Sequence, residues 1–169
     1  MDRIIRTGPE DRYMRSYWET FDAVAKEKKY LASTERFPFE SSVTFYRNLT
    51  AKGLPRVFAV DTRTDRCIGW CDISAKSETV GTLGTGLLKE YRDCGTGTLM
   101  LTEALRQARE YGFERVELEV LESNARAIHL YTKLGFVLQG RREKPLVWKH
   151  SGISENVLRM RIELKEKTK

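Results

Sequence analysis

Long apolar runs are missing from this sequence, whose hydrophobic stretches are short and interrupted by charged residues. A transmembrane helix needs about 20 consecutive apolar residues, so the sequence predicts no membrane span. The first six residues, MDRIIR, also lack the apolar centre of a secretory signal peptide. We therefore expect a cytoplasmic protein.

Cysteine and histidine are scarce, with three and two residues respectively. An odd number of cysteines without an export signal predicts reduced thiols. Cys67 and Cys71 are four apart in an expected strand and should share one face. Cys94 invites interpretation as a nucleophile, which we discount because no histidine stands beside it. His129 and His150 have no partners at ligand spacing, so we expect no metal site.

Repeats, low-complexity segments and interdomain linkers are absent as well. A chain of 169 residues fits one domain of ordinary size, and we expect residues 1–169 to form a single domain. The net charge is +6 and the isoelectric point is near 9.3. A basic balance can indicate nucleic-acid binding. Because acidic residues are interleaved with the basic ones, a polyphosphorylated ligand and a solvated surface explain the excess of positive charge better. We therefore do not expect nucleic acid as a partner.

A regular succession of strand and helix patterns fills the chain. Alternating apolar residues predict strands, and apolar residues at helical spacing predict amphipathic helices. The expected strands span 3–7, 55–61, 67–73, 79–88, 116–120, 156–164 and a stretch that begins at 136. The expected helices span 9–29, 40–52, a stretch that follows Gly97 and ends at Gly112, and 124–134. The second helix should bury Val43, Phe45, Tyr46 and Leu49, and the third should bury Leu99, Leu101, Leu105 and Ala108.

Two glycine-containing segments stand out within this succession. Gly81, Gly84 and Gly86 lie in an expected strand, where glycine often marks a bulge or the close approach of a ligand. Gly95 and Gly97 lie at the corner between that strand and the third helix. At such a corner, unpaired N–H groups and the positive end of the helix dipole converge, which favours a phosphate group. On its own, a G-x-G corner indicates only a tight turn.

Two motifs together carry more information than the corner alone. The corner reads R-x-x-G-x-G from Arg92 to Gly97, and residues 124–136 read N-x-x-A-x-x-x-Y-x-x-x-G-F. In this order and spacing, the pair resembles the GNAT (Gcn5-related) N-acetyltransferase superfamily, as a bacterial-type single-domain member. The resemblance implies an α/β (α+β) fold. Its central sheet is mixed, mostly antiparallel, of about seven strands and splayed in the middle, with about four flanking helices.

The resemblance also implies acetyl-CoA as co-substrate and assigns residues to it. In relatives, the strand before the corner carries a bulge beside which the pantetheine arm pairs with exposed backbone, and a free N–H near Leu87 would bind the thioester carbonyl. Arg126 and Lys133 are weaker candidates for phosphate contact. The implied cofactor-binding residues are Thr85, Gly86, Leu87, Arg92, Asp93, Cys94, Gly95, Thr96, Gly97, Thr98, Asn124 and Tyr131.

Two residues correspond to catalytic positions of the family. Tyr131 matches the general acid; because a phenol has a pKa of about 10 and a thiol about 8.5, it would act mainly as a hydrogen-bond donor to the departing sulfur. Glu119 matches the general base, which would accept a proton from the amine directly or through water. Glu117, on the same strand face, is the runner-up, and solvated carboxylates remain the alternative for both. Asn124 should cap its helix.

The function that follows is an N-acetyltransferase that moves the acetyl group of acetyl-CoA to a primary amine by direct attack. The acceptor would be a small molecule, an amino-acid derivative or a protein N-terminus. A non-catalytic acyl-CoA sensor with the same fold is the alternative.

Tyr30, Phe37 and Phe39 would either line the acceptor site or pack on the domain. Relatives often pair as homodimers through their C-terminal strands. Many also carry a tyrosine where Ser154 stands here, in the segment 152–156, so their acceptors do not transfer directly.

Overall fold

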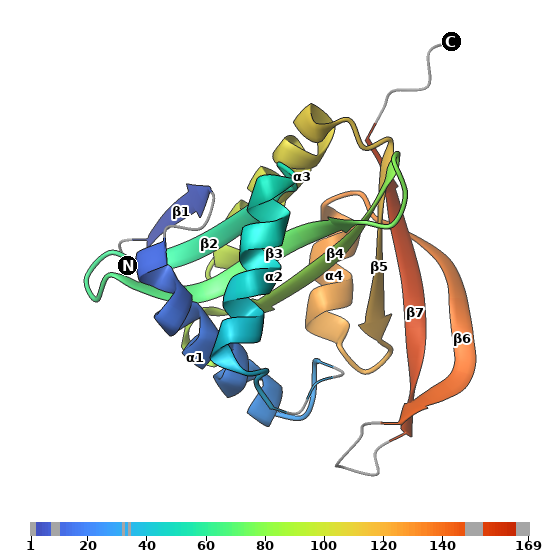
Figure 1. Ribbon diagram of the computed structural model, residues 1–169. Coiled ribbons are helices and arrows are strands. Elements are labelled where there is room, and N and C mark those ends of the chain that lie inside the picture. The colour runs from blue at the N-terminus through green and yellow to red at the C-terminus, as the bar shows by residue number, and fades with distance from the viewer. Residues whose placement is uncertain (1–2, 8–10, 32, 34, 148–153, 165–169) are drawn as a thin grey trace.

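The computed structural model describes residues 3–7, 11–31, 33, 35–147 and 154–164. Seven strands form one sheet in the order β1-β2-β3-β4-β5-β7-β6, and every neighbouring pair is antiparallel except β4–β5. Four α-helices flank the sheet (Figure 1), which confirms the expected fold class. The strands are β1 (Arg3–Thr7), β2 (Arg56–Asp61), β3 (Arg66–Ala75), β4 (Val80–Leu87), β5 (Arg115–Leu121), β6 (Val137–Val147) and β7 (Ser154–Glu163). The helices are α1 (Met14–Lys26), α2 (Phe39–Ala51), α3 (Thr96–Tyr111) and α4 (Ala125–Lys133), with short 3-10 turns at Asp11–Tyr13 and Lys89–Tyr91.

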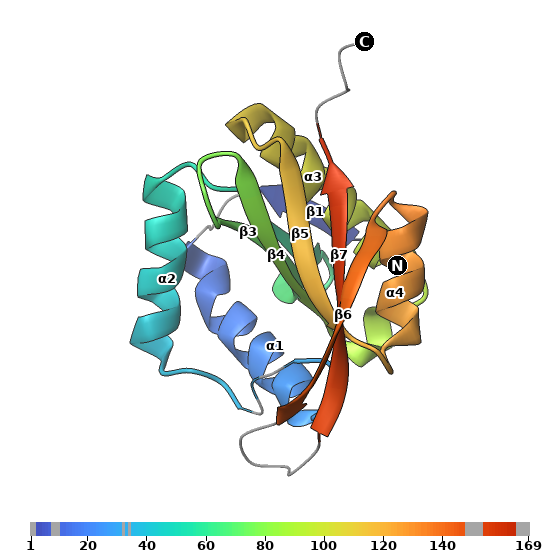
Figure 2. The ribbon, with the colours of Figure 1, turned by 90° about the vertical axis from the view of Figure 1, so that its right-hand side faces the viewer.

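Each face of the sheet has its own apolar core. Helices α1 and α2 cover one face, where Tyr17 stacks on Phe58 with ring centroids 5.3 Å apart. Helices α3 and α4 cover the other face, where Leu101 and Phe136 are buried; Figure 2 shows α1 and α2 on one side of the sheet and α4 on the other. In the described parts of the chain, no helix combines the length and the apolar character needed to cross a bilayer.

The burial of two helices differs in part from the sequence prediction. Leu101, Leu105 and Ala108 of α3 are buried as expected, but Leu99 is exposed and Met100 is buried instead. Phe45 of α2 is likewise exposed and packs edge-on against Tyr46. Both errors have one cause: apolar residues that are adjacent in sequence point about 100° apart on a helix, so only one of the two faces the sheet.

The two buried cysteines lie on opposite faces of the sheet, so the prediction that they share a face is wrong. Cys67 belongs to the core under α1, whereas Cys71 belongs to the core under α3. The pairing of β2 with β3 shifts register between Ala59 and Val60, where β3 has one extra residue. A shift of one residue exchanges the two faces of every position beyond it.

Strands β4 and β5 separate after a short parallel contact. They pair only at Val80, Gly81 and Thr82, whose partners run from Arg115 to Glu117. Beyond Thr82 each strand is held from its other side, because β4 pairs with β3 to its end and β5 pairs with β7 to its end. The expected splay is therefore present. The expected bulge is not, since the register of β4 with β3 is continuous over seven pairs.

The glycines of β4 make room mostly for protein side chains. A Cβ atom at Gly86 would come within 2.1 Å of the Trp70 ring, and one at Gly81 would come within 2.4 Å of Ile73. Gly84 differs, because its nearest neighbour would be a carboxylate oxygen of Asp72 at 3.4 Å. Gly86 thus lets Trp70 pack across the strand, whereas the space above Gly84 can admit a methyl group.

This difference predicts opposite effects for two otherwise equal substitutions on one strand face. Gly86→Ala should destabilise the protein by about 1–3 kcal/mol, because the new methyl group displaces the buried Trp70 ring. Gly84→Ala should be neutral or stabilising by up to about 1 kcal/mol, because it restricts the unfolded chain without a clash. Urea unfolding of both variants measures the difference, and equal destabilisation would contradict the packing described.

Candidate active site

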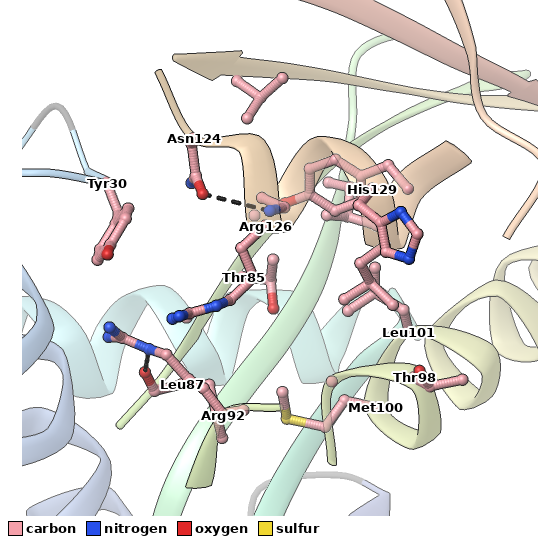
Figure 3. A pocket seen from close by; sticks show the side chains of 18 of the residues that line it. Tyr30, Thr85, Leu87, Arg92, Thr98, Met100, Leu101, Asn124, Arg126 and His129 are labelled. Atoms are coloured by element: carbon pink, nitrogen blue, oxygen red, sulfur yellow. Dashed lines mark hydrogen bonds between the residues drawn. The ribbon is translucent and has the colours of Figure 1, made fainter. Parts of the chain in front are cut away.

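A cavity of about 590 Å³ lies where β4 and β5 separate. Its wall contains Val24, from the core under α1, together with Met100 and Tyr131, from the core under α3 and α4. The cavity therefore reaches both faces of the sheet. Figure 3 shows Thr85 and Leu87 of β4 on one side of it and Asn124, Arg126 and His129 from the α4 segment on another. Two ligands could meet in such an opening from opposite faces.

The corner between β4 and α3 presents main-chain donors to this cavity. Gly95 has a φ of 86°, a left-handed conformation that favours glycine, and it directly precedes α3. The first bond of the helix runs from Leu99 N to Gly95 O at 3.1 Å, and no side chain among the described residues caps the helix start. The N–H groups at the first turn therefore have no acceptor within the helix. A negatively charged ligand group would fit there.

The part of β4 that faces the gap also presents backbone groups. Leu88 N donates to Ile68 O of β3 at 2.9 Å, while Thr79 O accepts from Glu114 N on the β5 side. Because main-chain groups alternate in direction along a strand, those of Thr85 and Leu87 point away from β3 and into the gap. An extended ligand could pair with this edge as an added strand would.

Arg92 is held by protein groups rather than left open toward a ligand. Its Nε donates to Leu87 O at 2.9 Å, its Nη1 donates to Glu27 Oε2 at 2.9 Å, and its Nη2 pairs with Glu27 Oε1. The guanidinium also lies 4.8 Å from the ring centre of Tyr30. Arg92 thus joins the end of α1 to the end of β4. Its phosphate contact stays a prediction, and the paired geometry favours a positioning role.

Asn124 and Arg126 connect α4 to the corner. The Asn124 side chain accepts a hydrogen bond from Ala127 N at 3.2 Å, so it caps α4 as predicted. Arg126 Nε lies 3.1 Å from Asp93 Oδ1. The two segments that carry the sequence motifs are therefore in direct contact, and both line the cavity.

Tyr131 lies in the wall of the cavity on α4. The residue is buried, and its ring packs against Phe136 with centroids 5.7 Å apart. Burial raises the pKa of its phenol well above the usual value of 10, with a smaller contribution from Cys71. In the described structure no protein group forms a hydrogen bond with the phenol oxygen. The hydroxyl therefore stays protonated and can donate a hydrogen bond to a ligand in the cavity.

Glu119 and Glu117 differ in both position and pairing. Glu119 lines the cavity, and its Oε2 lies 3.3 Å from Arg142 Nη2. Glu117 pairs with Lys76 at 2.6 Å and Arg115 at 3.1 Å, and the Lys76 hydrogen bond is the main reason that its pKa is lowered. Glu117 also sits where β4 and β5 still touch. The geometry thus favours Glu119 over Glu117 for contact with a ligand.

Most of the residues predicted from sequence meet at this cavity. Two of the predicted residues do not line the cavity. Thr96 is fully buried, and Cys94 is exposed, with its Sγ donating to Tyr91 O at 2.8 Å. Tyr30 lines the cavity, whereas Phe39 packs against Trp18. Positions 152 and 153 lie outside the described residues. The predicted residues in the wall are Thr85, Gly86, Leu87, Arg92, Asp93, Gly95, Gly97, Thr98, Glu119, Asn124 and Tyr131.

Several wall residues were not predicted from sequence. His129 and Leu130 lie between the motif positions of α4, and Met100 lies beside the exposed Leu99. Helical spacing from Arg126 and Ala127 could have suggested both α4 residues, since residues three or four apart on a helix share a face. Glu27, the partner of Arg92, had no sequence signal, because 65 residues separate the two.

Sequence comparison places a named family over most of the chain. Residues 11–136 match the acetyltransferase (GNAT) family. An N-alpha-acetyltransferase of Sulfurisphaera tokodaii is 47% identical over 51 residues, which is 30% of this chain and 30% of that protein. The uncharacterized N-acetyltransferase YdgE of Bacillus subtilis is 27% identical over 117 residues, which is 64% of this chain and 74% of that protein. The chain therefore aligns with less than a third of the first relative's length.

Solved structures of similar fold cover nearly the whole chain. A phosphinothricin acetyltransferase from Sinorhizobium meliloti, in complex with AcCoA, has a TM-score of 0.87 and 22% identity over 99% of this chain and 91% of that one. The putative acetyltransferase yncA from Salmonella typhimurium, with acetyl-CoA, has a TM-score of 0.87 and 15% identity over 99% and 96%. At these identities the likeness concerns the fold.

The Arg92–Glu27 contact should be energetically coupled, unlike an exposed ion pair. Its side chains are 9% and 24% exposed, against 57% and 40% for Arg66–Glu19, which also joins α1 to a strand. In double-mutant cycles with glutamine substitutions, we expect a coupling of about 1–3 kcal/mol for Arg92–Glu27 and less than about 0.5 kcal/mol for Arg66–Glu19. Urea unfolding measures both, and equal couplings would contradict the positioning role.

Proposed function

The chain belongs to the GNAT acetyltransferase family, and from that premise we propose that it transfers the acetyl group of acetyl-CoA to a primary amine by direct attack. The observation that supports this most is the cavity between the parted strands β4 and β5, open to both sheet faces and bordered by the start of α3. Residues 1–169 would form one such domain. The acceptor would be a small molecule, an amino-acid derivative or a protein N-terminus.

The main chain of two segments would hold the co-substrate. The N–H groups at the first turn of α3 would bind its diphosphate, each charge-assisted hydrogen bond contributing on the order of 1.5–3 kcal/mol. The backbone of Thr85 would pair with the pantetheine arm, while Leu87 O already accepts from Arg92 Nε at 2.9 Å and the Leu87 N–H is left for the thioester. Asn124 fixes the start of α4 and so the position of Tyr131. The residues of the cavity wall fit acetyl-CoA, because main-chain donors and an unpaired part of the β4 edge line the same cavity.

The chemistry would be shared by three groups in the wall. Acetyl-CoA supplies an acetyl group on a thioester, which a neutral amine can attack. The Leu87 N–H would stabilise the carbonyl oxygen as negative charge develops on it. Tyr131 would donate a hydrogen bond to the departing sulfur; because burial raises its pKa, it would not give up the proton fully. Glu119, directly or through water, would accept a proton from the amine.

Acetyl-CoA binding is the first test of this proposal. Isothermal titration calorimetry should detect binding of acetyl-CoA with a Kd below the millimolar range, because several main-chain donors act together. Consumption of thioester across a panel of amino acids, polyamines, aminoglycosides and N-terminal peptides then separates an enzyme from a sensor. Binding without turnover on any amine would favour the non-catalytic sensor, and absence of binding would reject both.

Tyr131→Phe tests the proposed donor to sulfur. We expect kcat to fall about 10- to 100-fold, the loss expected for one hydrogen bond to a charged group, while the Kd of acetyl-CoA changes less than about threefold. The buried ring and its contact with Phe136 are kept, so stability should change little. Steady-state kinetics beside calorimetry gives both numbers, and an unchanged kcat would remove Tyr131 from this role.

A further inference from the structure

Asp72 is a buried carboxylate that the proposed chemistry does not use. It lies in the middle of β3 on the face covered by α1 and α2, and the residue is only 8% exposed. Its Oδ2 accepts a hydrogen bond from Tyr46 Oη at 3.2 Å. For its other oxygen, Oδ1, the described residues supply no hydrogen-bond donor. One half of the carboxylate is therefore held and the other half lacks a protein partner.

The neighbouring cation does not neutralise this carboxylate by direct contact. Arg56 is the register partner of Asp72 on β2, but its Nη1 donates to Tyr46 O at 2.8 Å and to Thr50 Oγ1 at 2.6 Å. Within the described part of the chain, no lysine, arginine or histidine forms an ion pair with Asp72. A buried charge without a partner costs free energy, and burial accordingly raises the pKa of Asp72 to about 7.

Gly84 connects Asp72 to the cavity. The two residues are partners in the β3–β4 register, and Gly84 is part of the cavity wall. A Cβ at Gly84 would meet Asp72 Oδ1 first, at 3.4 Å. The oxygen without a partner is therefore the nearest atom to the space over Gly84, a residue of the cavity wall. Two residues on, the equivalent space over Gly86 is filled by Trp70.

We propose that Asp72 binds the protonated amine of the acceptor through the space over Gly84, and so selects cationic alkylamines over neutral acceptors. This inference rests on the proposed transfer to an amine. Of the three N–H groups of the ammonium, one would donate to Asp72 Oδ1 and another would lose its proton to Glu119 or water. The freed nitrogen lone pair would then form the new C–N bond as the C–S bond breaks, and a second nitrogen proton would pass to the departing thiolate, so that the products are the amide and the free thiol. Asp72 would act on acceptor binding, and Glu119 on the proton transfer.

Two variants on opposite sides of the contact test this role. Asp72→Asn keeps the shape and the Tyr46 contact but removes the charge, while Gly84→Ala keeps the charge but places a methyl group between it and the cavity. Thr82→Val, on the same face of β4 where the strand still pairs with β5, is the matched control. The probes are n-butylamine, a cation at pH 7.5, and its neutral isostere O-propylhydroxylamine.

We expect both variants to lower kcat/KM for n-butylamine about 10- to 100-fold, the value of one charge-assisted hydrogen bond. For O-propylhydroxylamine the change should stay within about threefold, as should the KM for acetyl-CoA, and Thr82→Val should resemble the wild type. Glu119→Gln should instead lower kcat for n-butylamine with little change in its KM, because Glu119 would act on the proton transfer and not on binding. Equal losses for the two probes in Asp72→Asn, or no loss, would overturn the assignment.

Calorimetry separates this inference from the proposed function. With CoA present, binding of n-butylamine to the wild type and not to Asp72→Asn supports the site even if no acetyl transfer occurs. Absence of n-butylamine binding to the wild type overturns the site, while acetyl transfer to another amine would leave the proposed function intact.

The stability of Asp72→Asn is a control for folding. The groups around Asp72 are Tyr46 from α2, Tyr17 from α1 and Arg56 from β2. Because the folded pKa of Asp72, about 7, exceeds its usual value of 3.8, the folded state binds the proton more tightly. The wild type should therefore lose stability as pH rises from about 4 to 7. Asp72→Asn should not show this loss of stability, and its melting temperature at pH 8 should be no lower than that of the wild type. A lower melting temperature would contradict the absence of an ion-pair partner for Asp72.

Discussion

The separation of β4 from β5 is the constraint on which the rest of the structure depends. A strand edge inside a sheet leaves main-chain N–H and C=O groups without partners, which is costly unless water or a ligand pairs with them. Beyond Thr82 the two strands do not pair. Each strand instead pairs with its outer neighbour as far as its own end, β4 with β3 and β5 with β7.

The surrounding elements convert this separation into a site. Tyr131 and Asn124 come from α4, on the far side of the gap from the β4 edge, and the start of α3 closes one end. The Arg92–Glu27 pair joins that end to α1, so the segments that would contact the donor and the acceptor are fastened together. The two carboxylates also differ in exposure: Glu119 is half exposed beside Arg142, whereas Asp72 is buried over Gly84.

Local features were predictable from sequence, and features that depend on register were not. The corner at Gly95, the Asn124 cap and the succession of elements follow from spacing and turn chemistry, and the structure agrees with them. The faces of Cys67 and Cys71 were missed because one extra residue in β3 inverts the alternation. The pairing of Arg92 with Glu27 and the position of Asp72 over Gly84 were missed because each joins residues that only the folded sheet brings together.

An opening that reaches both sides of a sheet has a kinetic consequence. Two molecules can enter from opposite directions and be bound at the same time, so neither needs to depart before the other arrives. No side chain is then required to carry the transferred group between them, which agrees with an exposed Cys94 outside the wall. Such an opening is suited to a ternary complex, and the order in which the two ligands bind then depends on their relative affinities.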